Sequence, residues 1–228
     1  MIGFDTATDD TVVAAVSDGE VVFSRSVGQT GNGRPAHATS LLVEVEAAAA
    51  AAGGWAAVER IAVGVGPGSF TGLRIGVSTA KALVGALGIE LVAVGTLAAL
   101  ARGAAGIAGG RPLVATLDAR RGELFAALYD GSGRQLAEPF VAAPEQLADR
   151  LSQLPESPLA VGSGALRFRD ELQERGAEIP DDSHPSHRVA GTGVCALGAA
   201  VAVSHPDAVT PIYLRPPDAE RWRERTKS

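Results

Sequence analysis

The apolar and polar positions of the first hundred residues follow two periods, that of a strand and that of a helix. Short runs rich in valine, isoleucine and alanine, bounded by glycine, proline or aspartate, predict strands. An Asp-Gly pair at residues 18 and 19 separates the second run from the third and is typical of a hairpin turn. The predicted strands cover residues 2–6, 11–16, 20–27, 60–65 and 90–94.

Two longer segments of this half show the helical period. In the first, apolar residues at positions 41, 42, 45, 48, 49 and 52 mark one face of a helix over residues 37–52, which Gly53-Gly54 ends. The second helix follows a glycine-rich loop and runs to about Leu87, and an alanine-rich helix then continues to about Arg102. The first half therefore predicts the order β-β-β-α-β-α-β, followed by a helix.

The second half of the chain repeats this order. Aligning the two halves places Asp5 on Asp118 and the turn at residues 18–19 on the Asp-Gly pair at residues 130–131. Two copies of a β-β-β-α-β-α unit are the pattern of the actin, hexokinase and Hsp70-like (ASKHA) architecture, in which two lobes enclose a cleft. We therefore predict an α/β fold of this class, with lobes at residues 1–102 and 103–228. The predicted elements of the second half are strands at 113–118, 124–129, 135–141 and 159–161, and helices at 144–154, from about 165, and at 193–203.

Residues 66–83 (GPGSFTGLRIGVSTAKAL) combine a strand end, a glycine-rich turn and a helix start. Backbone N–H groups at such a helix start can bind an anion, but we favour the simpler interpretation that Ser69 or Thr71 caps the helix; the two can coexist. Leu73-Arg74 stands where a Walker A loop needs Lys followed by Ser or Thr, and the G-x-G-x-x-G spacing is absent. The segment is therefore neither of these nucleotide-binding motifs.

Small residues recur every four positions along the second helix. Gly72, Gly76 and Ala80 form a smooth ridge, and a ridge of small residues lets another helix approach closely. The alanine run at residues 47–52 gives the first helix a second smooth surface. The ridge packs either on the first helix of the same lobe or on another subunit. We favour a partner, because the apolar helix faces exceed what one small core needs.

Five residues at strand ends fall where the predicted architecture holds a nucleotide. Asp5 and Thr6 close the first strand, Asp118 closes its counterpart, and Gly162 and Gly164 lie in a Gly-Ser-Gly loop of the kind that backs an adenosine. The same residue types are common in ordinary turns. Because no catalytic carboxylate is evident between these loops, the most that we expect is a residual nucleotide site. The histidines form no H-x-x-x-H pair on a helix, so we expect no metal.

Composition narrows the partners of the chain. Its 228 residues include 26 acidic and 20 basic side chains, for a net charge of −6, so tight binding to nucleic acid by this chain alone is not expected. The single cysteine, Cys195, excludes an internal disulfide framework. We expect no signal peptide, no membrane span and a cytoplasmic location. A basic excess at residues 221–227 suits either a solvated end or a weak contact with RNA bound by a partner.

Motifs along nearly the whole chain resemble the TsaB family of bacterial tRNA threonylcarbamoyladenosine biosynthesis proteins. Residues 66–83 carry the main resemblance. It continues in IGFDTA at residues 2–7, Arg34-x-x-His37 followed by Leu41-Leu42, DARRGE at residues 118–123 and PIYLR at residues 211–215. Where Ala38 and Val43 stand in this chain, the family usually has Ser and Pro.

The resemblance implies a subunit that supports chemistry without performing it. TsaB-like proteins pair through their first two helices with TsaD, which holds the metal and transfers a threonylcarbamoyl group to N6 of adenosine 37 in tRNAs that read codons beginning with A (t6A37). The ATPase TsaE joins that pair, and ATP or ADP can sit near the TsaB–TsaD junction. The resemblance thus implies no catalytic residue and no cofactor of this chain's own, tRNA contact mainly through partners, and a homodimer as one state of the isolated chain.

The resemblance and the ridge together assign the partner interface to the first two helices, including the loop end at which the second helix begins. The assigned residues are His37, Leu41, Leu42, Val45, Ser69, Phe70, Thr71, Gly72, Arg74, Gly76 and Ala80.

Two other classes of protein remain open at this point. An ATP-dependent small-molecule kinase of the same fold would turn over ATP without a partner. A peptidase of the M22 type, suggested by distant kinship of the family, would need a metal site that the sequence does not show.

Overall fold

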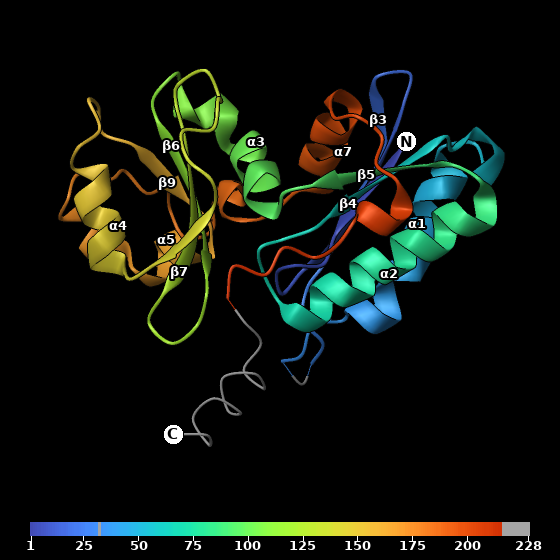
Figure 1. Ribbon diagram of the computed structural model, residues 1–228, viewed down its shortest axis with the longest axis horizontal. Coiled ribbons are helices and arrows are strands. Elements are labelled where there is room, and N and C mark those ends of the chain that lie inside the picture. Colours follow the sequence, from blue (N-terminus) through green and yellow to red (C-terminus); the bar gives the residue numbers. More distant parts are fainter. Residues whose placement is uncertain (32, 216–228) are drawn as a thin grey trace.

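The computed structural model describes residues 1–31 and 33–215, which form two sheets with helices packed between them (Figure 1). Within these ranges, no helix is long and apolar enough to span a lipid bilayer. The basic run at residues 221–227, for which a solvated end or a weak RNA contact was expected, lies outside the described residues.

The first sheet has five strands in the order β3-β2-β1-β4-β5. They are β1 (Ile2–Asp5), β2 (Thr11–Ser17), β3 (Glu20–Val27), β4 (Arg60–Gly64) and β5 (Glu90–Val94). β1 pairs antiparallel with β2 and parallel with β4, and β4 pairs parallel with β5. Asp18 and Gly19 both have positive φ angles, of 51° and 82°, which is the geometry that favours an Asp-Gly pair in a tight hairpin.

Helices cover both faces of the first sheet. On one face, α1 (His37–Ala51) and α2 (Phe70–Leu87) pack over a buried cluster that includes Phe4 of β1. On the other face lies α7 (Gly191–Ala200), so close that a Cβ on Gly3 would be 2.7 Å from Cys195 Sγ. Successive residues of a strand point to opposite faces, as Gly3 and Phe4 do here. A helix from late in the chain thus completes the first sheet.

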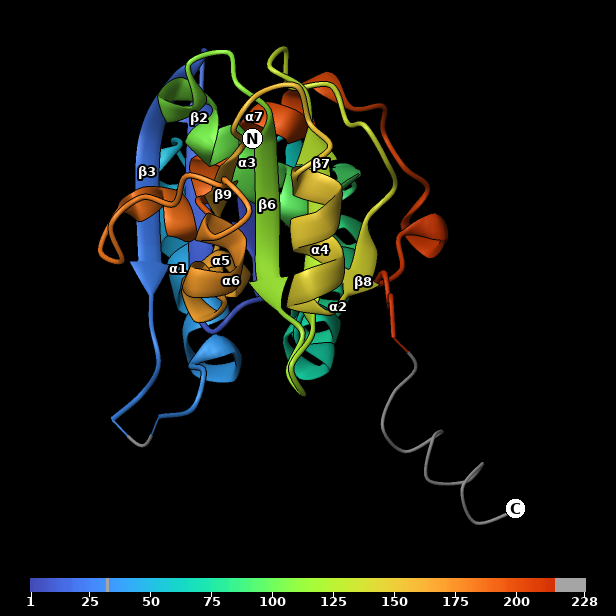
Figure 2. The same cartoon turned by 90° about the vertical axis from the view of Figure 1, so that its left-hand side faces the viewer.

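The second sheet repeats the order of the first without a fifth strand. Its order is β8-β7-β6-β9, made of β6 (Leu113–Asp118), β7 (Leu124–Tyr129), β8 (Phe140–Ala142) and β9 (Leu159–Val161). The outer face of this sheet is covered by α4 (Pro144–Leu151), α5 (Ser163–Arg167) and α6 (Arg169–Gln173), as Figure 2 shows. The matching strand orders confirm the predicted α/β fold with a duplicated unit.

The central core lies between the two sheets. α3 (Thr96–Ala108) packs against β6 on one side and α7 on the other, and its alanines and leucines belong to one cluster with both sheets. The connecting segments contain three short 3-10 helices, at Trp55–Ala57, Pro185–His187 and Pro206–Ala208.

Some predicted elements differ from the observed ones. The strand predicted over residues 135–141 is reduced to β8, because residues 131–138 are exposed and Pro139 has no N–H to pair. The last helix spans Gly191–Ala200 rather than residues 193–203. α3 continues past Arg102 because Ala104 and Ala108 are buried in the central cluster. It crosses the stretch where the lobe boundary was placed, and the division at residue 102 stays a prediction.

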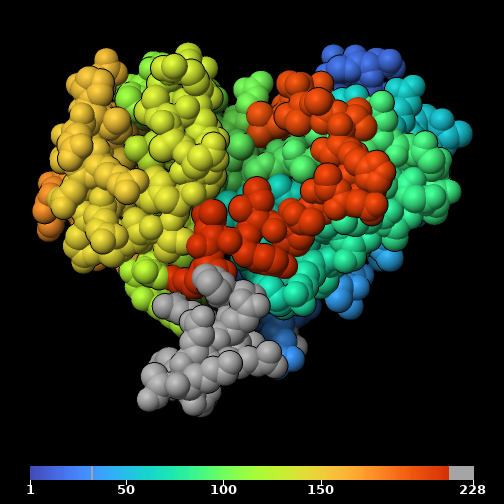
Figure 3. Space-filling view, viewed as in Figure 1, coloured from blue at the N-terminus to red at the C-terminus, as the bar shows by residue number. Residues whose placement is uncertain are grey.

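The last described segment, residues 209–215, reaches both halves of the molecule. Ile212 N donates to Val65 O at 2.7 Å beside the first sheet. Arg215 Nη1 donates to Ala119 O at 2.9 Å, just after β6. In Figure 3 this red segment runs over the surface from the first half toward the second.

Candidate functional site

The glycine-rich loop and the start of α2 form a capped helix end. Ser69 Oγ accepts a hydrogen bond from Gly72 N at 3.3 Å, so Ser69 is the N-cap of α2. Ser69 N in turn donates to Ala7 O at 2.7 Å. These contacts confirm the capping interpretation for Ser69 and tie the start of α2 to the loop that follows β1.

The ridge of small residues on α2 faces the interior of its own chain. Thr6 Oγ1 donates to Gly72 O at 2.7 Å, and a Cβ on Gly72 would lie 1.9 Å from Thr6 O. A Cβ on Gly76 would lie 2.4 Å from Thr6 Oγ1, and Ala80 is completely buried. The small residues let α2 lie close against the end of β1, which corrects the expectation that Gly72, Gly76 and Ala80 face a partner.

The inner side of α1 is buried in the same way. Leu41 and Val45 belong to the cluster over the first sheet. His37 is also buried, with its Nδ1 2.8 Å from Thr11 Oγ1. Burial lowers the pKa of His37 below its usual value and so favours the neutral ring. His37, Leu41 and Val45 hold α1 on the sheet, which corrects their assignment to the partner surface.

The outer side of α1 and α2 is exposed and largely apolar. On α1, Leu42 is 61% exposed and Val43 is 63% exposed. On α2, Arg74, Ser78 and Ala82 are exposed in one row, because residues four apart lie on the same side of a helix. A shallow groove between the two helices is lined by Leu42, Ser78, Thr79, Ala82 and Leu83. We call Leu42, Val43, Arg74, Ser78, Thr79, Ala82 and Leu83 the outer helix face.

Part of this face was predicted from the sequence and part was missed. Leu42 and Arg74 lie on it, and Ser69, Phe70 and Thr71 lie beside it at the start of α2. A contiguous apolar surface of this kind is typical of a protein-binding site. The signal that could have revealed the missed part is the apolar run from residue 41 to 43, which is wider than one core-facing stripe requires. The missed residues are Val43, Ser78, Thr79, Ala82 and Leu83.

Asp5, at the end of β1, is a buried carboxylate with both oxygens in use. Oδ1 accepts from Ala7 N at 2.6 Å, and Oδ2 accepts from Thr96 Oγ1 at 2.7 Å. Burial raises the pKa of Asp5 above its usual value, and these hydrogen bonds oppose that rise. Thr6 is buried too, with its hydroxyl committed to Gly72. The structure therefore presents neither Asp5 nor Thr6 to a nucleotide, contrary to expectation.

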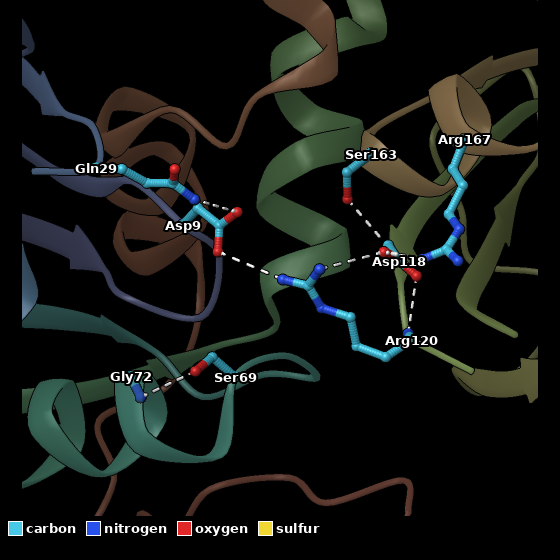
Figure 4. Close-up of polar contacts among 8 residues, drawn as sticks. All are labelled: Asp9, Gln29, Ser69, Gly72, Asp118, Arg120, Ser163 and Arg167. Atoms are coloured by element: carbon cyan, nitrogen blue, oxygen red, sulfur yellow. Dashed lines mark hydrogen bonds and ion pairs between the residues drawn. The ribbon is translucent and has the colours of Figure 1, made fainter. Parts of the chain in front are cut away.

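Asp118 lies at the equivalent place in the second half, and arginines of the chain already pair with it. Its carboxylate accepts from Arg120 N at 2.8 Å and pairs with Arg167 at 2.7 Å (Figure 4). The Arg120 guanidinium extends toward Asp9 of the first half, with 3.8 Å between Nη2 and Oδ1. A metal ion or phosphate group at Asp118 would have to compete with these interactions.

The glycine loop that was expected to back an adenosine packs against β6. A Cβ on Gly162 would lie 1.9 Å from Thr116 O, and a Cβ on Gly164 would lie 2.9 Å from Thr116 Cβ. All five expected nucleotide contacts belong to the described residues. Four of them are buried, and Asp118 alone among the five is partly exposed. Across residues 1–31 and 33–215, no group of three or more His, Cys, Asp or Glu side chains is placed to hold a metal ion.

Comparison with known proteins places these features in a family. A family model described as "TsaD: tRNA N6-adenosine threonylcarbamoyltransferase" matches residues 33–210. The "tRNA threonylcarbamoyladenosine biosynthesis protein TsaB" of Escherichia coli (strain K12) is 36% identical over 169 residues, which cover 69% of this chain and 71% of that protein. The solved structure of YeaZ from Pseudomonas aeruginosa aligns with a TM-score of 0.77 at 26% identity, covering 93% of this chain and 98% of that chain.

A more distant structure extends the likeness of fold. The ROK hexokinase from Thermus thermophilus aligns with a TM-score of 0.52 at 14% identity, covering 88% of this chain and 98% of that chain. At this identity the likeness concerns the fold alone. Together with the YeaZ match, it confirms the predicted ASKHA fold class.

Proposed function

The chain belongs to the TsaB family of tRNA threonylcarbamoyladenosine biosynthesis proteins, and from that premise we propose that it is the non-catalytic subunit that binds and activates TsaD. In this proposal TsaD transfers the threonylcarbamoyl group to N6 of adenosine 37 in tRNA. The match of this chain to the TsaD family model makes the two subunits relatives that share a fold.

The observation that carries the proposal is the outer helix face. Leu42 and Val43 are more than half exposed although they are large and apolar, and Leu42 lines a groove together with Ser78, Thr79, Ala82 and Leu83 of α2. The inner sides of the same helices are fully used in the chain's own core. A partner helix laid along the groove would remove Leu42 from water at little entropic cost, because α1 and α2 are already fixed.

The two carboxylates at the ends of β1 and β6 support a non-catalytic role. A catalytic carboxylate must be free to contact a metal, a phosphate or a reacting atom. Asp5 is enclosed by hydrogen bonds from Ala7 and Thr96, and Asp118 is paired with Arg167. A small-molecule kinase of this fold would need at least one of them to be open, so these contacts favour the subunit over the kinase.

The remaining partners follow from the same proposal. TsaE joins the pair to form the larger complex. ATP or ADP near the junction is held mainly by partner residues, since four of the five nucleotide contacts expected in this chain are buried. The contact with tRNA falls to the partners as well, because a chain with a net charge of −6 repels the phosphate backbone.

Depletion of the protein from its host tests this function. We expect t6A37, measured by mass spectrometry of digested tRNA, to fall several-fold, because in this proposal TsaD needs the chain for its activity. Restoring either the wild-type chain or the isosteric variant Asp118→Asn should restore the modification. Unchanged t6A37 after depletion would contradict the proposed pathway. Failure of a folded Asp118→Asn chain to restore it would contradict the non-catalytic role.

A further inference from the structure

Arg74, in the second turn of α2, is held in one position by two aromatic side chains. Its guanidinium carbon lies 3.9 Å from the centroid of the Phe70 ring, and its Nε donates to the Tyr213 hydroxyl at 3.3 Å. The rings of Phe70 and Tyr213 contact each other, with centroids 5.0 Å apart. A stacked guanidinium loses much of its rotamer freedom in advance and keeps its two terminal nitrogens at the surface.

The chain fixes Tyr213 through the segment that follows η3 (Pro206–Ala208). Ile212 N donates to Val65 O at 2.7 Å, and the Arg215 side chain donates through Nη1 to Ala119 O at 2.9 Å, so one backbone contact and one side-chain contact hold the segment before and after Tyr213. Tyr213 is 39% exposed. The second aromatic support of Arg74 is therefore a fixed part of the fold.

Within the part of the chain that the structure describes, Arg74 has no carboxylate partner. It is exposed, yet residues 61–89 contain no Asp or Glu in a protein whose net charge is −6. Other exposed arginines do pair, as Arg167 does with Asp118. The Arg74 guanidinium is held in position, and the residues around it in the sequence include no Asp or Glu. It is therefore suited to bind a negatively charged group of another molecule.

Arg74 is continuous with the outer helix face. It begins the row that Ser78 and Ala82 continue, and both of those residues line the groove between α1 and α2. A helix laid in that groove would pass the Arg74 guanidinium at the end of α2 that carries the N-cap.

We propose that Arg74 is the specificity-determining contact of the outer helix face and that it binds, through both terminal nitrogens, the carboxylate of an Asp or Glu side chain on TsaD. The inference rests on the proposed function, because it names the chemistry by which that surface recognises its partner. A protein carboxylate is favoured over an RNA phosphate because Arg74 is the one charged residue of the outer helix face and the chain as a whole is acidic.

The test measures the Kd of purified TsaD for Arg74→Lys and Arg74→Gln. Lysine keeps the charge but loses the planar fork, so we expect binding to weaken about tenfold with Lys and further with Gln. The loss with Gln should shrink at high salt, because screening weakens the ion pair in the wild type. Arg150→Lys and Arg150→Gln are matched controls, since Arg150 stacks 4.2 Å from the Phe140 centroid in the other half. They should bind TsaD as the wild type does.

The outcomes separate the inference from the function on which it rests. A wild-type chain that does not bind TsaD would overturn both. Wild-type binding together with unchanged affinity of a folded Arg74→Gln chain would overturn only the role of Arg74. If Arg74→Gln left the affinity for TsaD unchanged but weakened the binding of tRNA to the assembled complex, the proposal would also be overturned, because Arg74 would then bind an RNA phosphate.

Discussion

A chain that carries Ala82→Glu is expected to lose TsaD in co-purification while its thermal midpoint stays that of the wild type. Ala82 is exposed on α2 and lines the groove, so the isolated chain accommodates a glutamate there without strain. In the complex the same carboxylate would be buried without a partner. We expect affinity to fall about 100-fold or more, equivalent to about 3 kcal/mol.

Ala105→Glu is the matched control for this change. Ala105 is also an exposed alanine within a helix, but it lies on α3, away from the outer helix face. The substitution alters charge and helix propensity in the same way and should leave binding intact. If the two variants bound TsaD with equal affinity, the outer helix face would not be the TsaD-binding surface.

The second large effect concerns the fold rather than binding. Gly72→Ala is expected to destabilise the chain by about 3 kcal/mol or more, because a methyl group would lie 1.9 Å from Thr6 O and neither backbone can move aside without opening the core. Urea unfolding followed by circular dichroism measures the loss. It should appear in the isolated chain, with no partner present.

Gly85→Ala provides the opposite result within the same helix. A Cβ at Gly85 meets no atom within 4 Å, so the alanine variant gains helix propensity at no steric cost. We expect stabilisation of about 0.5–1 kcal/mol. If Gly72→Ala were as stable as Gly85→Ala, the close packing of α2 on the end of β1 would be wrong.

The arrangement of strands could be predicted because its signals are local. The turn at Asp18-Gly19 and its counterpart at Asp130-Gly131 mark the hairpins, and the match of Asp5 with Asp118 reveals the repeat. The place of α7 could not be predicted. Its sequence, GTGVCALGAA, is apolar or small on every side, so no pattern indicates which sheet it completes.

The sequence indicated which helices carry the candidate site but not which side of them is exposed. Spacing placed Gly72, Gly76 and Ala80 on one side of α2, yet small residues indicate close approach without indicating to what. In the structure the residue that they approach is Thr6, which lies 66 residues before Gly72 in the chain. The burial of Asp5 is equally non-local, because Thr96, which closes its second oxygen, belongs to the start of α3.

The most direct test of the central claim is a site-specific photo-crosslink from the outer helix face to TsaD. Cys195 is buried and its burial raises the pKa of its thiol to about 11, so an engineered cysteine can be labelled selectively. A benzophenone probe on Ser78→Cys should crosslink to TsaD, and the same probe on Ala196→Cys, exposed on α7, should not. Crosslinking from position 196 and not from position 78 would contradict the account.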